Sequence, residues 1–377
     1  MNPKSLKLAF LFFIHGVLIS SLCFLLSSSQ ALAEKAPRFK VEDVYQAEDI
    51  VWGLCFLNPN EILFTQKKGR LSHLDLKTKK LTPITGLPEI QPRGQGGLMD
   101  VQAHPDFEKN SLIYFSYSAK NKENSWTTRI ARARLEKSEL KDLEILFTAN
   151  VDSNKGEHFG SRIVFDGKGH IFFGIGDRGQ RDLAQSLEYH NGKIIRLNEN
   201  GSIPKDNPFL STAKSRPEIW SYGHRNPQGM ARHFETGEIW SNEHGPRGGD
   251  EINLILPGKN YGWPVVTFGR EYWGPKIGEG TEKPGIENPF YQFTPSIAPS
   301  ALLIYSGKIF PEWKGHFFSS ALVMQHLNRL AVKDGKATQE EKMLRDLNER
   351  IRNVVESPDG QIYLSTDSGR ILRLTTN

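Results

Sequence analysis

The sequence predicts an all-β chain folded as a six-bladed β-propeller of four-stranded antiparallel blades. The two ends of the chain repeat each other, because EILFTQKKGRLSHL (Glu61–Leu74) aligns without a gap on QIYLSTDSGRILRL (Gln361–Leu374). Each copy reads as a strand, a turn ending in Gly-Arg and a second strand. Similar units recur between the ends, and apolar residues at helical spacing are scarce. Short strands repeated at these intervals are typical of a propeller.

The repeated units follow one another along the chain. They are Val51–Leu76, Gly97–Leu135, Arg162–Leu197, Gly229–Leu256, Ala301–Val332 and Arg350–Leu374. A strand near Phe39–Tyr45 is expected to pair with the last unit and close the ring, which removes exposed sheet edges. Helical pieces are expected to be short, as at Asp182–Tyr189. A β-sandwich is the structural alternative, but it does not explain repeats over the whole chain.

The first 33 residues read as an export signal. Lys4 and Lys7 precede the apolar stretch Leu8–Leu26, and Ala31-Leu32-Ala33 offers a cleavage site of small residues. An uncleaved membrane anchor is the alternative, since the apolar stretch is nearly long enough to span a bilayer. Cleavage after Ala33 would leave residues 34–377 as a single propeller domain, periplasmic or secreted, without a further membrane span.

Cysteine content and net charge argue against a disulfide-linked protein and against a protein that binds nucleic acid or anionic membranes. Cys23 would leave with the signal, so Cys55 alone would remain and no intramolecular disulfide is expected. The formal net charge of +5 includes Lys4 and Lys7, so removing them gives 5 − 2 = +3. Because no dense basic run occurs, neither nucleic acid nor an anionic membrane is the expected partner.

The stretch from Ser221 to Pro264 has the composition of ligand-binding loops, being rich in glycine, proline, histidine, arginine and carboxylates. Arg225 and Asn226 combine a cation and an amide suited to a carboxylate or a polarised carbonyl. The backbone carbonyls of the turn around Gly245 and Pro246 suit calcium. Structural turns are the alternative at both places.

Two further candidates lie outside that stretch. His158 sits on a loop just before an expected strand, where a histidine can act as a general base or simply cap a turn. Arg350 and Arg352 alternate, so on a strand both would point to one face and require an anion between them. The alternative is two surface arginines paired with Glu349 or Asp346.

Taken together, these blocks resemble the soluble sugar dehydrogenases that depend on pyrroloquinoline quinone (PQQ), both the glucose and the broader aldose types. The resemblance covers about Trp52 to Leu374. Its blocks are GQGGLMDVQAHPDF, HFGSRIVF, IGDRG, GHRNPQG, EHGPRGGDEINLI, GKNYGWP and RIRNVVESPDG. It implies oxidation of the anomeric carbon of aldoses to lactones with PQQ and Ca²⁺, and transfer of the electrons to an external acceptor.

The resemblance also implies roles for individual residues. His158 matches the general base, with Arg225 near the reactive carbonyl of the cofactor. The residues matched to cofactor contacts are Gln95, Arg225, Asn226, Arg350 and Arg352. Gly245 and Pro246 match positions whose backbone oxygens bind the calcium, while Asp177 and Asp182 match the sugar side.

The chain departs from the glucose enzymes at three positions. Glu157 stands where they have an aspartate beside the base, and Asp182 where they have a glutamine. Val323 stands near the place of a cofactor-binding lysine. A calcium-dependent lactonase or hydrolase and a non-catalytic binding propeller are the alternative functions; the first predicts a metal held by side-chain carboxylates and the second predicts loss of the base or the arginines.

Overall fold

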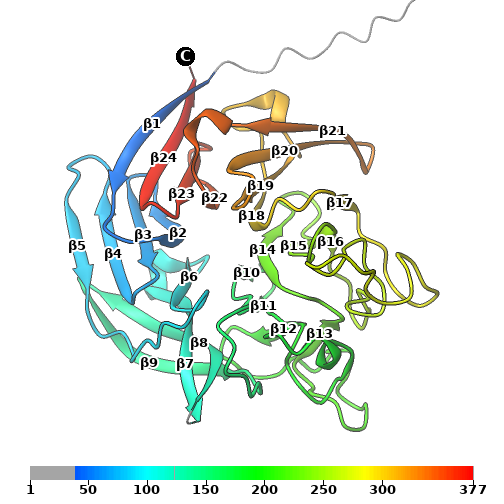
Figure 1. Ribbon diagram of the computed structural model, residues 1–377. Coiled ribbons are helices and arrows are strands. Elements are labelled where there is room, and N and C mark those ends of the chain that lie inside the picture. The colour runs from blue at the N-terminus through cyan, green and yellow to red at the C-terminus, as the bar shows by residue number, and fades with distance from the viewer. Residues whose placement is uncertain (1–38, 123, 377) are drawn as a thin grey trace, which may run out of the picture. The chain divides into compact units, whose positions relative to one another are not determined.

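The computed structural model describes residues 39–122 and 124–376, and these form a closed ring of β-sheets. Twenty-four strands make six four-stranded antiparallel sheets, arranged around a central axis (Figure 1). The predicted six-bladed propeller is therefore confirmed. The export signal predicted at residues 1–33 lies outside the described residues.

Each of the first five blades is built from four consecutive strands. Blade one is β2 (Val51–Asn58), β3 (Glu61–Gln66), β4 (Arg70–Asp75) and β5 (Leu81–Ile84). Blade two is β6 (Leu98–Ala103), β7 (Leu112–Lys122), β8 (Ser125–Glu136) and β9 (Glu139–Thr148). Blade three is β10 (Ile163–Phe165), β11 (His170–Ile175), β12 (Lys193–Asn198) and β13 (Ile219–Tyr222).

The later blades follow the same order until the ring closes. Blade four is β14 (Pro227–Arg232), β15 (Ile239–Glu243), β16 (Asp250–Leu254) and β17 (Tyr291–Phe293). Blade five is β18 (Pro299–Ile304), β19 (Phe317–Ala321), β20 (His326–Lys333) and β21 (Lys336–Met343). Blade six joins β22 (Ile351–Glu356), β23 (Ile362–Thr366) and β24 (Arg370–Thr376) to β1 (Phe39–Gln46).

The first strand closes the last blade, as predicted. β1 runs antiparallel to β24, with Phe39 opposite Thr376 and Gln46 opposite Arg370. The innermost strands β2, β6, β10, β14, β18 and β22 each contact the next around the ring, and β22 contacts β2. Apolar side chains fill the space between neighbouring blades, for example Phe115 and Leu63 between blades one and two.

A buried ion pair ties together the inner strands of several blades. The Arg162 guanidinium donates to Asp100 Oδ1 at 2.7 Å and to the Ser300 carbonyl at 3.0 Å, and lies 4.4 Å from the centre of the Trp52 ring. Ile163 N donates to the other Asp100 oxygen at 2.9 Å. A fully satisfied polar network of this kind fixes the relative placement of the strands that share it.

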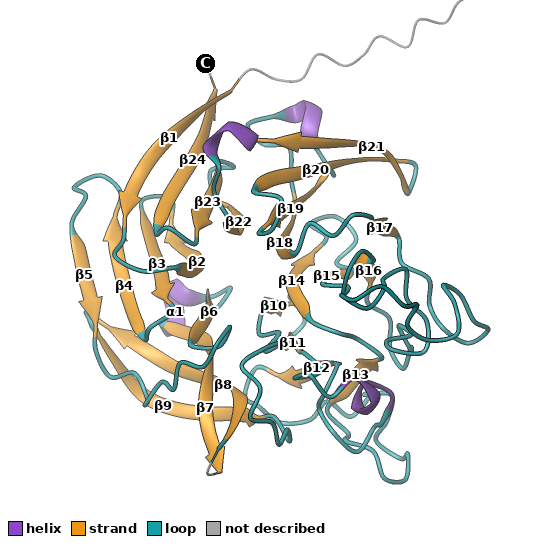
Figure 2. Ribbon diagram, in the orientation of Figure 1, coloured by secondary structure: helices purple, strands orange, loops and turns teal. Residues whose placement is uncertain are grey.

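Helical segments are few and short (Figure 2). They are α1 (Phe107–Asn110) and the 3-10 turns η1 (Arg181–Gln185), η2 (Pro311–Trp313) and η3 (Arg345–Leu347). Cys55 is buried in β2, and burial raises the pKa of its thiol to about 12. Within the described residues, no helix has the length and apolarity to span a membrane.

Candidate active site

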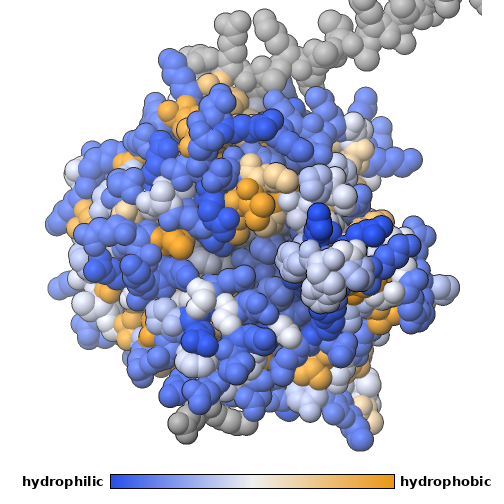
Figure 3. Space-filling view, in the orientation of Figure 1, coloured by the Kyte–Doolittle hydropathy of each residue, from blue (hydrophilic) through white to orange (hydrophobic). Residues whose placement is uncertain are grey.

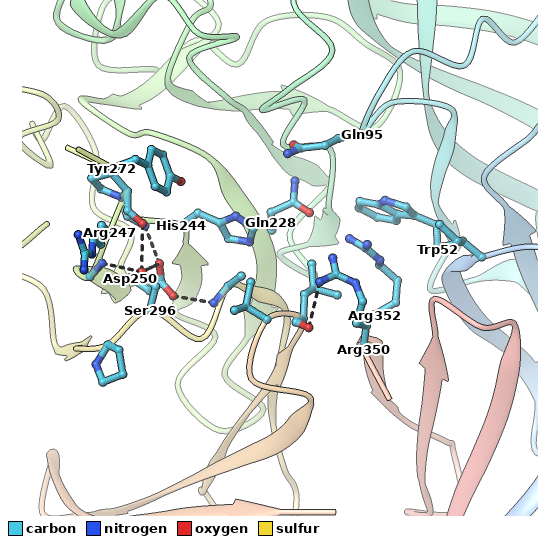
Figure 4. A pocket seen from close by; sticks show the side chains of 18 of the residues that line it. Trp52, Gln95, Gln228, His244, Arg247, Asp250, Tyr272, Ser296, Arg350 and Arg352 are labelled. Carbon is cyan, nitrogen blue, oxygen red and sulfur yellow. Dashed lines mark hydrogen bonds between the residues drawn. The ribbon is translucent and has the colours of Figure 1, made fainter. Parts of the chain in front are cut away.

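A cavity of about 430 Å³ opens where the inner ends of blades one, two, four, five and six meet, a size in the usual range for small-ligand sites. Side chains from these blades converge on it (Figure 4). In the space-filling view a hollow lies at the centre of a largely hydrophilic face, with an apolar patch beside it (Figure 3). Val323 lines the cavity and is 60% exposed.

One wall of the cavity is cationic. Arg350 Nε donates to Asp367 Oδ2 at 2.8 Å, and Arg352 Nε donates to Asp367 Oδ1 at 2.7 Å. Burial acts to raise the pKa of Asp367, but the charges and hydrogen bonds of both arginines outweigh it and lower that pKa, so the carboxylate is ionised. Two guanidinium groups thus share one carboxylate, and both arginines line the cavity. Both side chains face the same cavity, and the anion between them is Asp367.

His158 is held in one orientation by a buried aspartate. Its Nδ1 lies 2.6 Å from Asp177 Oδ1, and Trp263 Nε1 donates to Asp177 Oδ2 at 2.8 Å. Asp177 is only 1% exposed. Burial alone would raise its pKa, but the hydrogen bond from His158 and the charges of His158 and Arg225 lower it. An ionised acceptor at Nδ1 leaves Nε2 as the ring nitrogen that can take a proton.

The backbone at His158 adopts a left-handed conformation, with φ of 54°. Such a φ is uncommon for a residue with a side chain, and strain of this kind is often found at functional sites. The loop lies directly against the end of β11, where a Cβ on Gly176 would sit 2.1 Å from the His158 carbonyl oxygen. Only glycine permits this approach. His158 N also donates to Gln95 Oε1 at 2.9 Å, which links the histidine to a residue that lines the cavity.

Arg225 and Asn226 lie beside the cavity and directly precede β14 in the sequence. Arg225 Nη1 donates to the Gly245 carbonyl at 2.9 Å, and its backbone N donates to Glu243 at 2.7 Å. Asn226 Oδ1 accepts from Gly160 N at 3.2 Å. Asn226 Nδ2 is buried without a hydrogen-bond partner in the described part of the chain. An unpaired buried donor is costly, so this amide is a candidate partner for a water or a ligand oxygen.

The turn between β15 and β16 supplies backbone oxygens. Gly245 and Pro246 both line the cavity, and the Pro246 carbonyl accepts from Ser296 Oγ at 3.3 Å. No group of three or more histidine, cysteine, aspartate or glutamate side chains in residues 39–122 and 124–376 is arranged to hold a metal ion. The cavity offers a cation these carbonyl oxygens and the single carboxylate of Asp250, which also lines it, so water and oxygens of a ligand would have to supply the remaining ligands.

His244 precedes this turn and also lines the cavity. Burial and the charges of Arg225 and His158 lower its pKa to about 3, so the ring is neutral. Its Nε2 donates to the Pro299 carbonyl at 2.9 Å. His244 therefore adds a neutral imidazole, not a further cation, to the cavity.

Comparison with known proteins decides the family. The sequence profile described as Glucose / Sorbosone dehydrogenase matches residues 48–373. The chain belongs to this family. It is 40% identical over 358 residues to the Escherichia coli protein named aldose sugar dehydrogenase YliI, covering 93% of this chain and 96% of that protein. It is 28% identical to quinoprotein glucose dehydrogenase B of Acinetobacter calcoaceticus, covering 98% of this chain and 94% of that protein.

Solved structures agree with this membership. The crystal structure of soluble aldose sugar dehydrogenase from Escherichia coli, in the apo form, superposes with a TM-score of 0.87 at 40% identity, covering 90% of this chain and all of that one. The PQQ-bound form of aldose sugar dehydrogenase from Streptomyces coelicolor gives a TM-score of 0.75 at 26% identity, covering 90% and 99% of the two chains. The expected family and the expected enzyme class, a sugar dehydrogenase, are confirmed.

The site residues expected from the resemblance to the soluble PQQ-dependent sugar dehydrogenases fall into two groups, apart from the two aspartates. Those that line the cavity are Gln95, Gly245, Pro246, Arg350 and Arg352. His158 and Arg225 lie beside it and connect to it through their hydrogen bonds to Gln95 and Gly245, and Asn226 connects to it by accepting from Gln228, which lines the cavity.

The two aspartates expected on the sugar side are placed differently. Asp177 is buried, and its two oxygens accept hydrogen bonds from His158, Gly179 and Trp263, so it faces His158 and not the solvent. This also replaces the idea that Glu157, next to His158 in sequence, is the acid that orients the base. Asp182 is exposed on η1 and does not line the cavity.

Several residues that shape the cavity were not predicted from the sequence. Trp52, Lys67 and His244 line the cavity, while Trp263 and Asp367 hold other members in place. The repeat offered a signal for one of them. Lys67 aligns with Asp367 in the two end repeats, so both belong to equivalent turns of adjacent blades.

A fully buried lysine supports the segment that follows Asp177. Lys193 Nζ donates to the carbonyls of Leu183 at 3.1 Å and Ala184 at 2.9 Å, and also to that of Asn191. Replacing Lys193 by methionine removes the donor from all three oxygens. Because leaving one buried polar group unpaired costs about 1–3 kcal/mol, Lys193→Met is expected to lower the melting temperature at pH 7, measured by calorimetry.

The same variant has a pH signature. Burial lowers the pKa of Lys193 from 10.5 to about 7. Between these values the unfolded chain binds more protons than the native one, so this group makes wild-type stability rise with pH. The difference in melting temperature between wild type and Lys193→Met is expected to widen from pH 7 to pH 9.5. A difference that does not change with pH would contradict the assignment.

Proposed function

We propose that this chain is an exported PQQ- and calcium-dependent dehydrogenase that oxidises the anomeric carbon of aldose sugars to lactones. The observation that carries the proposal is the oriented pair of His158 and Asp177, 2.6 Å apart, beside a cavity with a cationic wall. The relatives named aldose sugar dehydrogenase and quinoprotein glucose dehydrogenase support the same reaction. Periplasmic or secreted placement follows from the export signal expected at residues 1–33.

The residues of the cavity fit PQQ. This cofactor is a tricarboxylate with quinone oxygens, so it requires cations and hydrogen-bond donors. Arg350 and Arg352 would hold a carboxylate, and the unpartnered Nδ2 of Asn226 would donate to a cofactor oxygen. PQQ, when bound, supplies the acceptor for the two electrons that the sugar loses.

His158 is assigned the proton transfer. Its Nδ1 donates to the Asp177 carboxylate, so Nε2 keeps a lone pair and accepts the proton of the anomeric hydroxyl. Loss of that proton from oxygen and of hydride from carbon turns the C1–O1 bond into the carbonyl of a lactone. Asp177 stabilises the imidazolium that forms, because its own pKa is lowered.

Calcium would bind jointly with the cofactor. Gly245 and Pro246 offer two backbone carbonyls, whereas Ca²⁺ takes six to eight oxygens. Oxygens of the cofactor and water would complete the set, and the ion would act as a Lewis acid on the quinone oxygen. A lactonase with its metal held by carboxylate side chains finds no support, since the described residues offer no such cluster.

Reconstitution tests the proposed function. The mature protein, mixed with PQQ and CaCl₂, is expected to change the absorption spectrum of PQQ and to reduce an artificial dye in the presence of an aldose panel. When calcium is withheld with EGTA, PQQ affinity is expected to fall, because in the proposed site the ion would be held jointly by the carbonyls of Gly245 and Pro246 and by the cofactor. No spectral change and no dye reduction with any sugar would refute the proposal.

A further inference from the structure

A cation from blade one faces the same cavity as Arg350 and Arg352. Lys67 lines the cavity together with Arg350 and Arg352. Its Nζ donates to the Gly94 carbonyl. Among the described residues, Asp367 pairs with both arginines, and no carboxylate forms an ion pair with Lys67. The ammonium group therefore has two N–H donors beyond the one given to Gly94, and no anion bound to it.

The turn that carries Lys67 is fixed from both sides. Lys67 N donates to the Ile50 carbonyl at 3.1 Å, and the Lys67 carbonyl accepts from Leu98 N at 3.0 Å. A Cβ on Gly97 would lie 2.1 Å from the Lys67 carbonyl oxygen and 2.8 Å from Lys67 Cγ. Glycine at position 97 thus lets the side chain of Lys67 pass close to the backbone of blade two. The direction of this side chain is built into the fold.

The equivalent turn of the neighbouring blade serves the same cavity. Lys67 follows β3 of blade one, and Asp367 follows β23 of blade six, at matching positions of the end repeats. Asp367 uses this position to hold Arg350 and Arg352. The turn after the second strand therefore presents a charged side chain to the cavity wall in both blades.

The surroundings of Lys67 favour an added negative charge. Burial lowers the pKa of Lys67, and the charge of Arg352 lowers it further, while Asp49 and Asp367 act in the opposite direction. An anion placed between Lys67 and Arg352 would stabilise the charged form of Lys67. Its negative charge would offset the cost of burying the ammonium and would reduce the repulsion between the two cations. A carboxylate suits this position because it can accept from the ammonium and the guanidinium at once.

We propose that Lys67 binds a carboxylate of PQQ. In the glucose enzymes a lysine near the position of Val323 is expected to bind the cofactor; here that position holds an apolar side chain, and Lys67 supplies the cation instead. This inference rests on the proposed function. Val323 and Lys67 line the same cavity, so a cation from blade one can serve a ligand that lies between them. Val323 belongs to blade five and Lys67 to blade one. Because the two residues are far apart in the sequence, an alignment at Val323 alone suggests that the cavity lacks this cation.

Equilibrium binding of PQQ in the presence of calcium tests this inference without turnover. Lys67→Met is expected to raise the Kd for PQQ about 10- to 100-fold, as loss of one charge-assisted hydrogen bond implies. Lys67→Arg keeps the charge and is expected to stay close to wild type. Lys68→Met is the matched control. Lys68 is exposed, adjoins Lys67 in the sequence and does not line the cavity, so this variant should leave the Kd for PQQ unchanged.

The outcomes separate the two proposals. If wild type binds PQQ and Lys67→Met binds it equally well, Lys67 has no part in binding and the proposed function is unaffected. If Lys67→Arg is as weak as Lys67→Met, charge is not the cause and the inference is overturned. If wild type itself shows no PQQ binding, the proposed function fails and the inference fails with it.

Discussion

Replacing His158 by alanine is expected to lower kcat for aldose oxidation about 10²- to 10⁴-fold, the range typical of removing a general base. The reason is geometric. Asp177 occupies Nδ1, so Nε2 is the atom of this side chain able to take the proton of the anomeric hydroxyl. Turnover should be measured by dye reduction under saturating PQQ and calcium.

Cofactor binding should be spared in the same variant. Arg350, Arg352 and Lys67 line the cavity, whereas His158 lies beside it. The Kd for PQQ of His158→Ala is therefore expected to stay within a few-fold of wild type. His233→Ala is a suitable control, because His233 lies in the turn between β14 and β15 and does not line the cavity. A fully active His158→Ala enzyme would remove His158 from the role of base.

Asp177→Asn is expected to reduce kcat by about 10²- to 10⁴-fold, although the side chain keeps its size. Asp177 Oδ1 accepts from His158 Nδ1 and from Gly179 N, and Oδ2 accepts from Trp263 Nε1. An asparagine has one acceptor oxygen. If that oxygen serves Trp263, its amide faces His158 and moves the ring proton to Nε2, which then cannot accept a proton from the sugar.

The tautomer of His158 distinguishes this effect from general damage. Nitrogen-15 NMR of the imidazole should show the proton on Nδ1 in wild type and a shift of population toward Nε2 in Asp177→Asn. The Kd for PQQ should change little, because Asp177 is buried and away from the cavity wall. An Asp177→Asn enzyme with normal turnover would show that Asp177 does not set the tautomer.

The ring was predictable because its signal is repeated along the whole chain. Strand, turn and strand recur with Gly-Arg at the end of the turn in Glu61–Leu74 and Gln361–Leu374, and β1 was expected where the last blade requires an edge partner. Because the strand-turn-strand pattern occurs in every blade, a loop insertion in one blade does not hide it. The cationic pair was predictable for a similar reason, since alternation at Arg350 and Arg352 fixes one face of a strand.

The partners of these residues were harder to predict, because they depend on how separate blades approach. Glu157 stands beside His158 in the sequence, yet the acid that binds the imidazole is Asp177, nineteen residues further along the chain. The left-handed backbone at His158 and the close approach at Gly176 create that pairing, and neither has a sequence signature. Lys67 was missed because a single lysine in a polar turn resembles any solvated one.

The pairing of β1 with β24 bears on when the cofactor can be loaded. The wall that carries Arg350 and Arg352 belongs to the blade that is completed only when the N-terminal strand joins the C-terminal strands. Lys67 and Trp52 come from the opposite end of the chain. A chain that lacks either end thus lacks one half of this wall, and if PQQ binds as proposed, its uptake would have to follow synthesis and folding of all six blades.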